Sequence, residues 1–171
     1  MSNWISENRS LSQSERENNA RIVRNIFGTW GWSLNAVCGM LGNMEVESGI
    51  SPAVVQNFAT NNPPKLGYGL IQWTSNVNNV HDNTLWAWIY RNYHDYNWQD
   101  GDRQCIFING EDGKYYYPTK NYPLTYSQFK VSTETPEYLA ATYHYNRERG
   151  TWTNLRPQYA RKWYEFFRRG R

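Results

Sequence analysis

Two glutamates near the C-terminal end of a helix expected within residues 33–52 have the setting that acid–base chemistry needs. The segment predicts a helix, because Ser33 is a good N-cap and Gly49 suits the left-handed position that follows a helix. Glu45 and Glu47 would then lie in the last turn, beside apolar surface and at the negative end of the helix dipole. Both surroundings favour the protonated form of a carboxyl group. Such a carboxyl suits a general acid.

Periodicity does not choose between the two glutamates. Residues two apart on a helix point about 200° apart, so Glu45 and Glu47 cannot both face one cleft. Both would lie at opposite borders of an apolar arc, and solvated or ion-paired glutamates are the alternative interpretation. Gly39 and Gly42 weaken the helix and indicate that something packs close to its backbone. The apolar arc consists of Ala36, Val37, Met40, Leu41 and Met44.

The sequence gives little support for a metal site, a cofactor-binding loop or a disulfide framework. The three histidines show no metal-ligand spacing, so we expect no metal site. Gly67-Tyr68-Gly69 lacks the third glycine of a dinucleotide-binding loop, and we expect no cofactor. Cys38 and Cys105 are too few for a disulfide framework. Two buried thiols are favoured, although a disulfide between them is geometrically possible.

The bulk composition predicts one globular domain spanning residues 1–171, with 39% hydrophobic and 17% aromatic residues. Aromatic rings fill cores, but they also stack on sugars and on bases. The net charge is only +3, and Arg168, Arg169 and Arg171 supply much of it, so a nucleic-acid-binding face is not expected. A mildly basic protein would still favour an anionic polymer such as a bacterial wall.

The chain start shows no secretory signal pattern, and no apolar run approaches membrane length. We therefore expect no membrane span. The protein would work in the cytosol, or leave the cell by lysis or as part of a particle.

The remaining pattern predicts an α+β fold that is predominantly helical. Helices are expected over about 13–27, 84–96, 125–131, 136–145 and from Pro157 onward. The apolar residues 66–74 predict a short strand. Residues 105–108 and 114–117 flank a turn-rich tip, which predicts a hairpin. The domain would thus combine a helical part with a small β-sheet or hairpin.

Three motifs together resemble the phage tail lysozyme family. They are CGMLGNM at 38–44, Glu47-Ser48, and GYGLIQWT at 67–74. The likeness extends to KVSTETPEYLA at 130–140 and, more loosely, to the closing aromatic helix. It covers most of the chain and weakens over about 77–122. The Glu-Ser pair followed by Gly-Leu-x-Gln is similar, more distantly, to the motifs of goose-type lysozymes and soluble lytic transglycosylases.

The resemblance implies a lysozyme-like domain whose substrate is the peptidoglycan glycan strand. The family's catalytic glutamate precedes a serine, which is Glu47 here. By the same match Gln72 would line the sugar cleft, and Tyr145 would be the tyrosine of a substrate-holding Tyr-Asn pair. Tyr68 and Trp73 are added as aromatic neighbours of the motif, with a core tryptophan as the alternative for Trp73.

The resemblance leaves the reaction open. It favours a muramidase that hydrolyses the β-1,4 bond between N-acetylmuramic acid and N-acetylglucosamine. No second carboxylate is evident. Asp82 is a candidate, but a solvated loop aspartate is the simpler interpretation, and Glu45 drops to a supporting or surface role. A lytic transglycosylase therefore stays open, as does a non-catalytic wall-binding tail protein. Phage tail proteins are candidate partners, and the protein would act on the host wall from the virion tail or after release at lysis.

Overall fold

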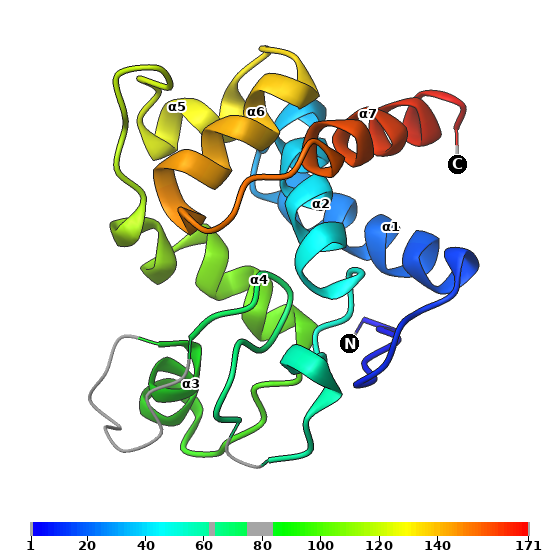
Figure 1. The fold of residues 1–171 in the computed structure, drawn as a ribbon, viewed down its shortest axis with the longest axis vertical. Helices are drawn as coiled ribbons and strands as arrows, with labels where there is room; N and C mark the ends of the chain where they lie inside the picture. The colour runs from blue at the N-terminus through cyan, green and yellow to red at the C-terminus, as the bar shows by residue number, and fades with distance from the viewer. Residues whose placement is uncertain (1, 62–63, 75–83, 171) are drawn as a thin grey trace.

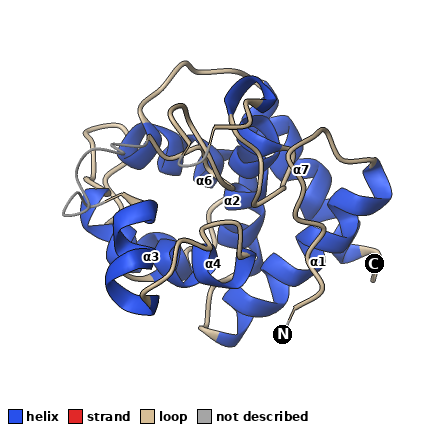
Figure 2. Cartoon of the chain, turned by 90° about the horizontal axis from the view of Figure 1, so that it is seen from below, coloured by secondary structure: helices blue, strands red, loops and turns tan. Residues whose placement is uncertain are grey.

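The computed structural model describes residues 2–61, 64–74 and 84–170. These residues form a helical array (Figures 1 and 2). The α-helices are α1 (Gln13–Thr29), α2 (Leu34–Ser48), α3 (Leu85–Tyr93), α4 (Gly101–Asn109), α5 (Tyr126–Val131), α6 (Pro136–Tyr143) and α7 (Leu155–Arg168). Shorter turns of helix are η1 (Gln56–Phe58), η2 (Glu111–Tyr115) and the π-helix η3 (His144–Glu148).

Helix α2 lies at the centre of the molecule, with α1, α6 and α7 around it and with α4 and α3 farther from it (Figure 1). Its ends are capped as the sequence predicts. The Ser33 hydroxyl accepts a hydrogen bond from the Ala36 N–H at 3.1 Å, and Gly49 adopts a left-handed φ of 63°. Nearly all of α2 is buried, because neighbouring helices cover it on several sides.

Two glycines allow α6 and α7 to approach the backbone of α2. A Cβ on Gly39 would lie 3.0 Å from the backbone of Ala140 in α6. A Cβ on Gly42 would collide with the Arg156 carbonyl oxygen and would lie 2.9 Å from the Ala160 nitrogen in α7. The predicted close packing against this helix is confirmed.

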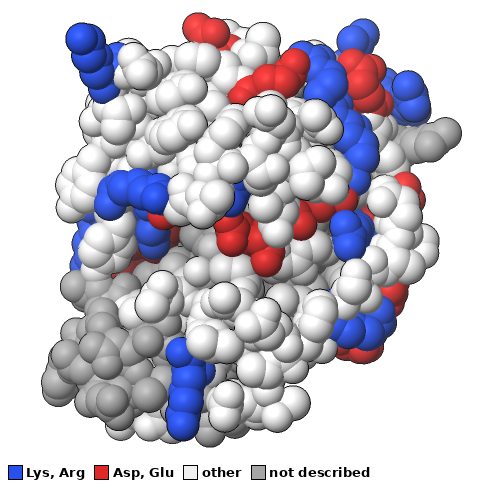
Figure 3. Space-filling model, in the orientation of Figure 1, with Lys and Arg blue, Asp and Glu red and all other residues white. Residues whose placement is uncertain are grey.

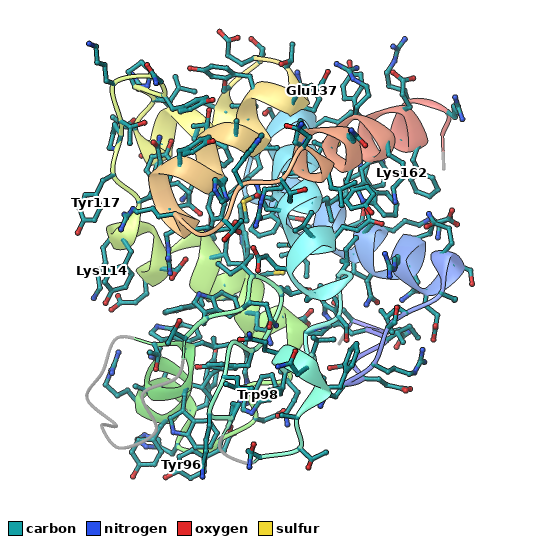
Figure 4. All side chains as sticks on the ribbon, in the orientation of Figure 1. Tyr96, Trp98, Lys114, Tyr117, Glu137 and Lys162 are labelled. Carbon is teal, nitrogen blue, oxygen red and sulfur yellow. The ribbon has the colours of Figure 1, made fainter. Side chains whose placement is uncertain are left out.

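The part of the molecule around α3 and α4 is built largely from aromatic side chains (Figure 4). Trp98 is buried and packs edge to face on Tyr68, with ring centroids 5.0 Å apart. Gln104 of α4 is fully buried; its Oε1 accepts a hydrogen bond from the Leu70 N–H at 2.9 Å, and its amide donates to the Pro52 carbonyl at 2.8 Å. This side chain therefore ties the 66–74 turn and the loop at Pro52 to α4.

The prediction of a small β-sheet or hairpin is wrong. Residues 105–117 fold into the end of α4 and into η2, and the described residues contain no sheet, only isolated bridges between Val55 and Tyr68 and between Tyr68 and Trp73. Asp100 starts α4 by accepting hydrogen bonds from the Asp102 and Arg103 N–H groups. The short apolar run from 105 is compatible with helix or strand, and a turn-rich tip follows it in both cases. Residues 66–74 form a tight turn instead of a strand.

The helix predictions for 13–27, 84–96 and 125–131 are confirmed as α1, α3 and α5. Ser12 and Glu15 form the expected capping box of α1. The final helix begins at Leu155, ahead of Pro157, and the helix after Thr135 changes into the π-helix at His144.

Both cysteines are free and buried, as favoured from the sequence. Burial raises the pKa of Cys38 to about 12 and that of Cys105 well above its usual value. In the described part of the chain, no helix has both the length and the apolar character needed to cross a membrane.

The close approach at Gly42 generates a stability prediction. Gly42→Ala should lower the free energy of unfolding by about 1–3 kcal/mol, because the added methyl group would separate α7 from α2. Gly28→Ala is the matched control: Gly28 also lies in a helix, but a Cβ there meets nothing within 4 Å. Gly28→Ala should raise the free energy of unfolding by up to about 1 kcal/mol, because alanine has a higher helix propensity than glycine. Chemical denaturation of both variants checks this, and equal effects would contradict the packing argument.

Candidate active site

The end of α2 and the 66–74 turn meet at a single hydrogen-bonding residue. The Ser48 hydroxyl lies 2.9 Å from the Leu70 carbonyl oxygen, to which it donates. Within the turn, Tyr68 and Trp73 exchange backbone hydrogen bonds of 3.0 and 2.8 Å. Gly69 has a φ of 81°, and a Cβ there would press on the Trp73 ring. The two separate motifs of the sequence are therefore joined in space.

Two adjoining pockets of about 490 and 510 Å³ lie on this junction and share Glu47, Gln72 and Thr74. The first continues along Trp73, Tyr115, Glu148 and Arg149, and the second along Gln56, Lys65 and Gly67. Glu47 thus lies in the middle of an extended groove. Figure 3 shows acidic atoms in the middle of this face, at the boundary between its upper and lower parts. Clefts of this kind are the usual places for ligands.

Glu47 is held by a buried arginine. Arg156 Nη2 donates to Glu47 Oε1 at 2.5 Å, and its other terminal nitrogen Nη1 donates to Glu148 Oε2 at 2.8 Å and to Asn43 Oδ1 at 2.9 Å. The Arg156 side chain is 4% exposed, whereas that of Glu47 is 23% exposed. Glu47 therefore contacts both the protein interior and the groove.

Glu148 and His144 complete this cluster from the π-helix. The Glu148 side chain is 7% exposed, and His144 Nδ1 lies 3.7 Å from Glu148 Oε2. Among the described residues, Glu148 Oε1 and both ring nitrogens of His144 have no hydrogen-bond partner. Burial raises the pKa of Glu148; His144 and Arg156 oppose this shift, while the charge of Glu47 adds to it.

Glu45 has a different environment on another face of α2. Its carboxylate accepts hydrogen bonds from Lys162 at 2.5 Å, from the Trp163 indole at 2.7 Å and from Arg16 at 3.2 Å. Lys162 extends from α7, on the side of the molecule away from α3 (Figure 4). The Glu45 side chain is 2% exposed and lines neither groove pocket. Its contacts are those of a residue that joins helices.

Gln72 and Trp73 lie in the groove, each fixed by hydrogen bonds. Gln72 has a φ of 57°, and its amide nitrogen donates to the Gly69 carbonyl at 2.9 Å and to the Val54 carbonyl at 3.0 Å. Both amide hydrogens are thereby used, so the side-chain carbonyl oxygen is the group of this amide that could still bind a ligand, as an acceptor. The Trp73 indole donates to Asp112, which also binds Arg147 through both carboxylate oxygens.

Two of the predicted binding residues lie outside the groove. Tyr68 is fully buried, and its hydroxyl accepts a hydrogen bond from the Trp86 N–H at 2.7 Å. Tyr145 lines a separate pocket, where its ring stacks between Tyr122 and Trp152. Asp82 lies outside the described residues. A direct substrate contact for Tyr68 or Tyr145 stays a prediction without support from their positions.

Sequence reasoning missed Arg156 and Glu148. Arg156 immediately precedes Pro157, where the sequence predicts the last helix to begin, and no motif marks it. Glu148 follows the Tyr145-Asn146 pair, but only the π-helix brings it beside α2. A π-turn within a helix is often found at a functional site, although no sequence pattern announces one.

The described residues contain no group of three His, Cys, Asp or Glu side chains arranged to hold a metal ion. In the part of the chain that the structure describes, the fold and the groove define a helical protein with the carboxyl group of Glu47 partly exposed at the centre of an elongated cleft. Its residues 18–167 match the phage tail lysozyme family. The chain belongs to this family, which confirms the resemblance drawn from the motifs.

One similar protein is morphogenesis protein 1 of Bacillus phage B103. The two are 32% identical over 146 residues, which cover 85% of this chain. The chain spans only 38% of the length of that relative.

The different environments of the two glutamates predict different effects on stability. Glu45→Gln should lower the free energy of unfolding by about 1–3 kcal/mol, because it removes the buried charge that Lys162, Trp163 and Arg16 contact. Glu47→Gln should change it by less than about 1 kcal/mol, since Arg156 keeps Asn43 and Glu148 as acceptors. Denaturation of both variants at one pH measures this. A larger loss for Glu47→Gln would make Glu47 chiefly a structural ion-pair residue.

Proposed function

We propose that residues 1–171 form one peptidoglycan-cleaving domain, a muramidase in which Glu47 is the general acid. The observation that carries this proposal is the position of Glu47, which lines both pockets of the groove while its neighbour Glu45 is enclosed between helices. Membership of the phage tail lysozyme family supports the substrate class.

In the proposed reaction, Glu47 donates its proton to the oxygen that bridges N-acetylmuramic acid and N-acetylglucosamine. The bond between that oxygen and the muramic C1 breaks, and positive charge develops on C1 and the ring oxygen. Water then forms the new bond to C1 and returns a proton to Glu47, which acts as a base in this second half. Gln72 lines both pockets and has both amide hydrogens in use, so its carbonyl oxygen would accept hydrogen bonds from sugar N–H or O–H groups.

A lytic transglycosylase is the second candidate, and one observation favours it. The described part of the groove offers Glu148 as its second carboxylate, but one Glu148 oxygen binds Arg156 and the other is buried. A carboxylate enclosed in this way is poorly placed to activate water or to attack a sugar. If the C6 hydroxyl of the muramic residue attacks C1, one acid–base carboxyl is enough.

The location of the protein is part of the proposal. The relative is named a morphogenesis protein of a phage, which supports a place in the virion from which the domain would act on the host wall. Phage tail proteins would then be its partners. Release at lysis is the alternative.

The proposal predicts that Glu47→Gln lowers the rate of wall clearing by a factor of about 100 or more, because the amide cannot donate the required proton. The measurement is turbidity loss and reducing-end release from purified bacterial walls. Glu137→Gln is the control, since it also removes a carboxylate that binds an arginine, Arg161, but lies away from the groove. Equal clearing by both variants would overturn the assignment of Glu47. Failure of the wild type to clear walls while still binding them would favour a non-catalytic tail protein.

The products separate the two reactions. Hydrolysis should leave reducing muramic ends, whereas attack by the C6 hydroxyl leaves 1,6-anhydromuramic ends that are lighter by one water. Mass spectrometry of the soluble fragments reads this directly. We expect reducing ends, and a majority of anhydro ends would replace the muramidase by the transglycosylase.

A further inference from the structure

The groove has two arms that meet at Glu47, one in each of the two adjoining pockets. Besides Glu47, the charged side chains that line the first arm are Arg147, Glu148 and Arg149, and the second arm is lined by Lys65. Each arm therefore carries basic side chains, while the acidic side chains lie at the middle and in the first arm only.

The charges at the middle of the groove are paired within the protein. Glu47 and Glu148 both bind the buried guanidinium of Arg156, at 2.5 and 2.8 Å. Arg147 binds both carboxylate oxygens of Asp112. Two carboxylates thus share one cation there, and the remaining cation has its own carboxylate. The middle of the groove offers no free positive charge to a ligand.

The two remaining cations, Arg149 and Lys65, are exposed and have no acidic partner among the described residues. Arg149 Nη2 donates to the carbonyl oxygens of Tyr115 at 2.5 Å and of Asn146 at 3.1 Å, and its guanidinium lies 5.1 Å from the centroid of the Tyr117 ring. These neutral contacts hold the guanidinium in place without balancing its charge. One unbalanced cation therefore lines each arm.

A peptidoglycan strand carries carboxylates on both sides of the bond that the proposed reaction cleaves. The sugar on one side of this bond is a muramic residue. Because the two sugars alternate, the second sugar on the other side is a muramic residue again. Each muramic residue bears a lactyl group, from which a short stem peptide with carboxylates extends. A strand of N-acetylglucosamine alone carries no such groups. Opposite charges at matching positions give specificity to binding.

We propose that Arg149 and Lys65 bind stem-peptide carboxylates on the two sides of Glu47, so that the groove selects peptide-bearing strands over uncharged ones. This inference rests on the proposed function and names the part of the substrate that the groove recognises. Arg149 keeps Nε and Nη1 for a carboxylate, because the protein carbonyls use only Nη2. Both residues determine specificity and take no part in bond cleavage.

The test compares two forms of one ligand by calorimetry. The first is soluble strands with intact stem peptides, from walls freed of phosphate polymers. The second is the same strands after their carboxylates have been converted to primary amides. The full chain carries Glu47→Gln, so that the strands stay intact. It should bind the native form about four- to 25-fold more tightly, because each exposed ion pair contributes about two- to fivefold. At ~1 M salt, where the Debye length is about 3 Å, this preference should shrink.

Variants of the two cations assign the preference to them. Lys65→Gln and Arg149→Gln should each remove part of it, and the double variant should bind both forms equally. Arg149→Lys keeps the charge and should keep part of the preference. Lys120→Gln is the matched control, because Lys120 is also exposed but lines a separate pocket, and it should leave the preference unchanged.

Equal binding of the two forms by the chain with both cations would overturn the proposal. An undiminished preference in Lys65→Gln would do so too, and this variant keeps the test valid if an Arg149 variant does not fold, since the side chain of Lys65 makes no ion pair within the described residues. Strands stripped of their peptides by an amidase keep only the lactyl carboxylate and should bind about as weakly as the amidated form. Tight binding of these strands would overturn the assignment to the stem peptide.

Cleavage kinetics separate this inference from the proposed function. With Glu47 intact, Lys65→Gln should raise KM on native strands by about two- to fivefold and leave kcat unchanged, because uniform binding is lost. A fall in kcat at unchanged KM would contradict a role in specificity. Cleavage of native and amidated strands with one KM would overturn the inference and keep the muramidase. Carboxylate-dependent binding without cleavage would keep the inference about the ligand and refute the muramidase.

Discussion

The contact of α7 with α2 at Gly42 is the constraint on which the site depends. Because position 42 has no side chain, the backbone of Arg156 reaches the surface of α2. The Arg156 guanidinium is then buried beside Asn43, where it must find hydrogen-bond acceptors. Glu47 and Glu148 supply them. Helix packing and the charge arrangement of the groove therefore have one common origin.

The same constraint separates the roles of two glutamates that the sequence left equal. The angular offset of about 200° turns Glu45 toward cations of α1 and α7, and turns Glu47 toward the groove. Helical periodicity could predict that the two point apart. It could not predict which direction would be enclosed, because that depends on where α7 crosses α2. The family motif favoured Glu47 from the sequence alone, but it gave no physical reason why Glu47 and not Glu45 would face the groove.

Local signals predicted most helices, because caps such as Ser12 and Ser33 act on residues within one turn of themselves. They failed at 105–117, where a short apolar run followed by a turn-rich tip suits a helix as well as a strand. The groove was predictable as far as its motif residues Glu47, Gln72 and Trp73. Arg156 and Glu148 were not, since their approach to α2 depends on tertiary contacts and on a π-turn that no local pattern marks.

The sequence is rich in aromatic residues, and their side chains serve mainly to pack the interior. Tyr68 is enclosed, and Trp73 is 5% exposed with its indole bound to Asp112, so neither offers a free ring face to a sugar. Polar and charged groups such as Gln72, Lys65 and Arg149 line the groove together with the partly exposed ring of Tyr115. Under the proposed function, hydrogen bonds from these polar groups would discriminate among glycans, because a polar partner left unpaired in a covered groove is costly. The ring contacts of Tyr68 with Trp98 and of Trp73 with Phe107 contribute by packing the 66–74 turn, which carries Gln72, against α4 and the loop before it.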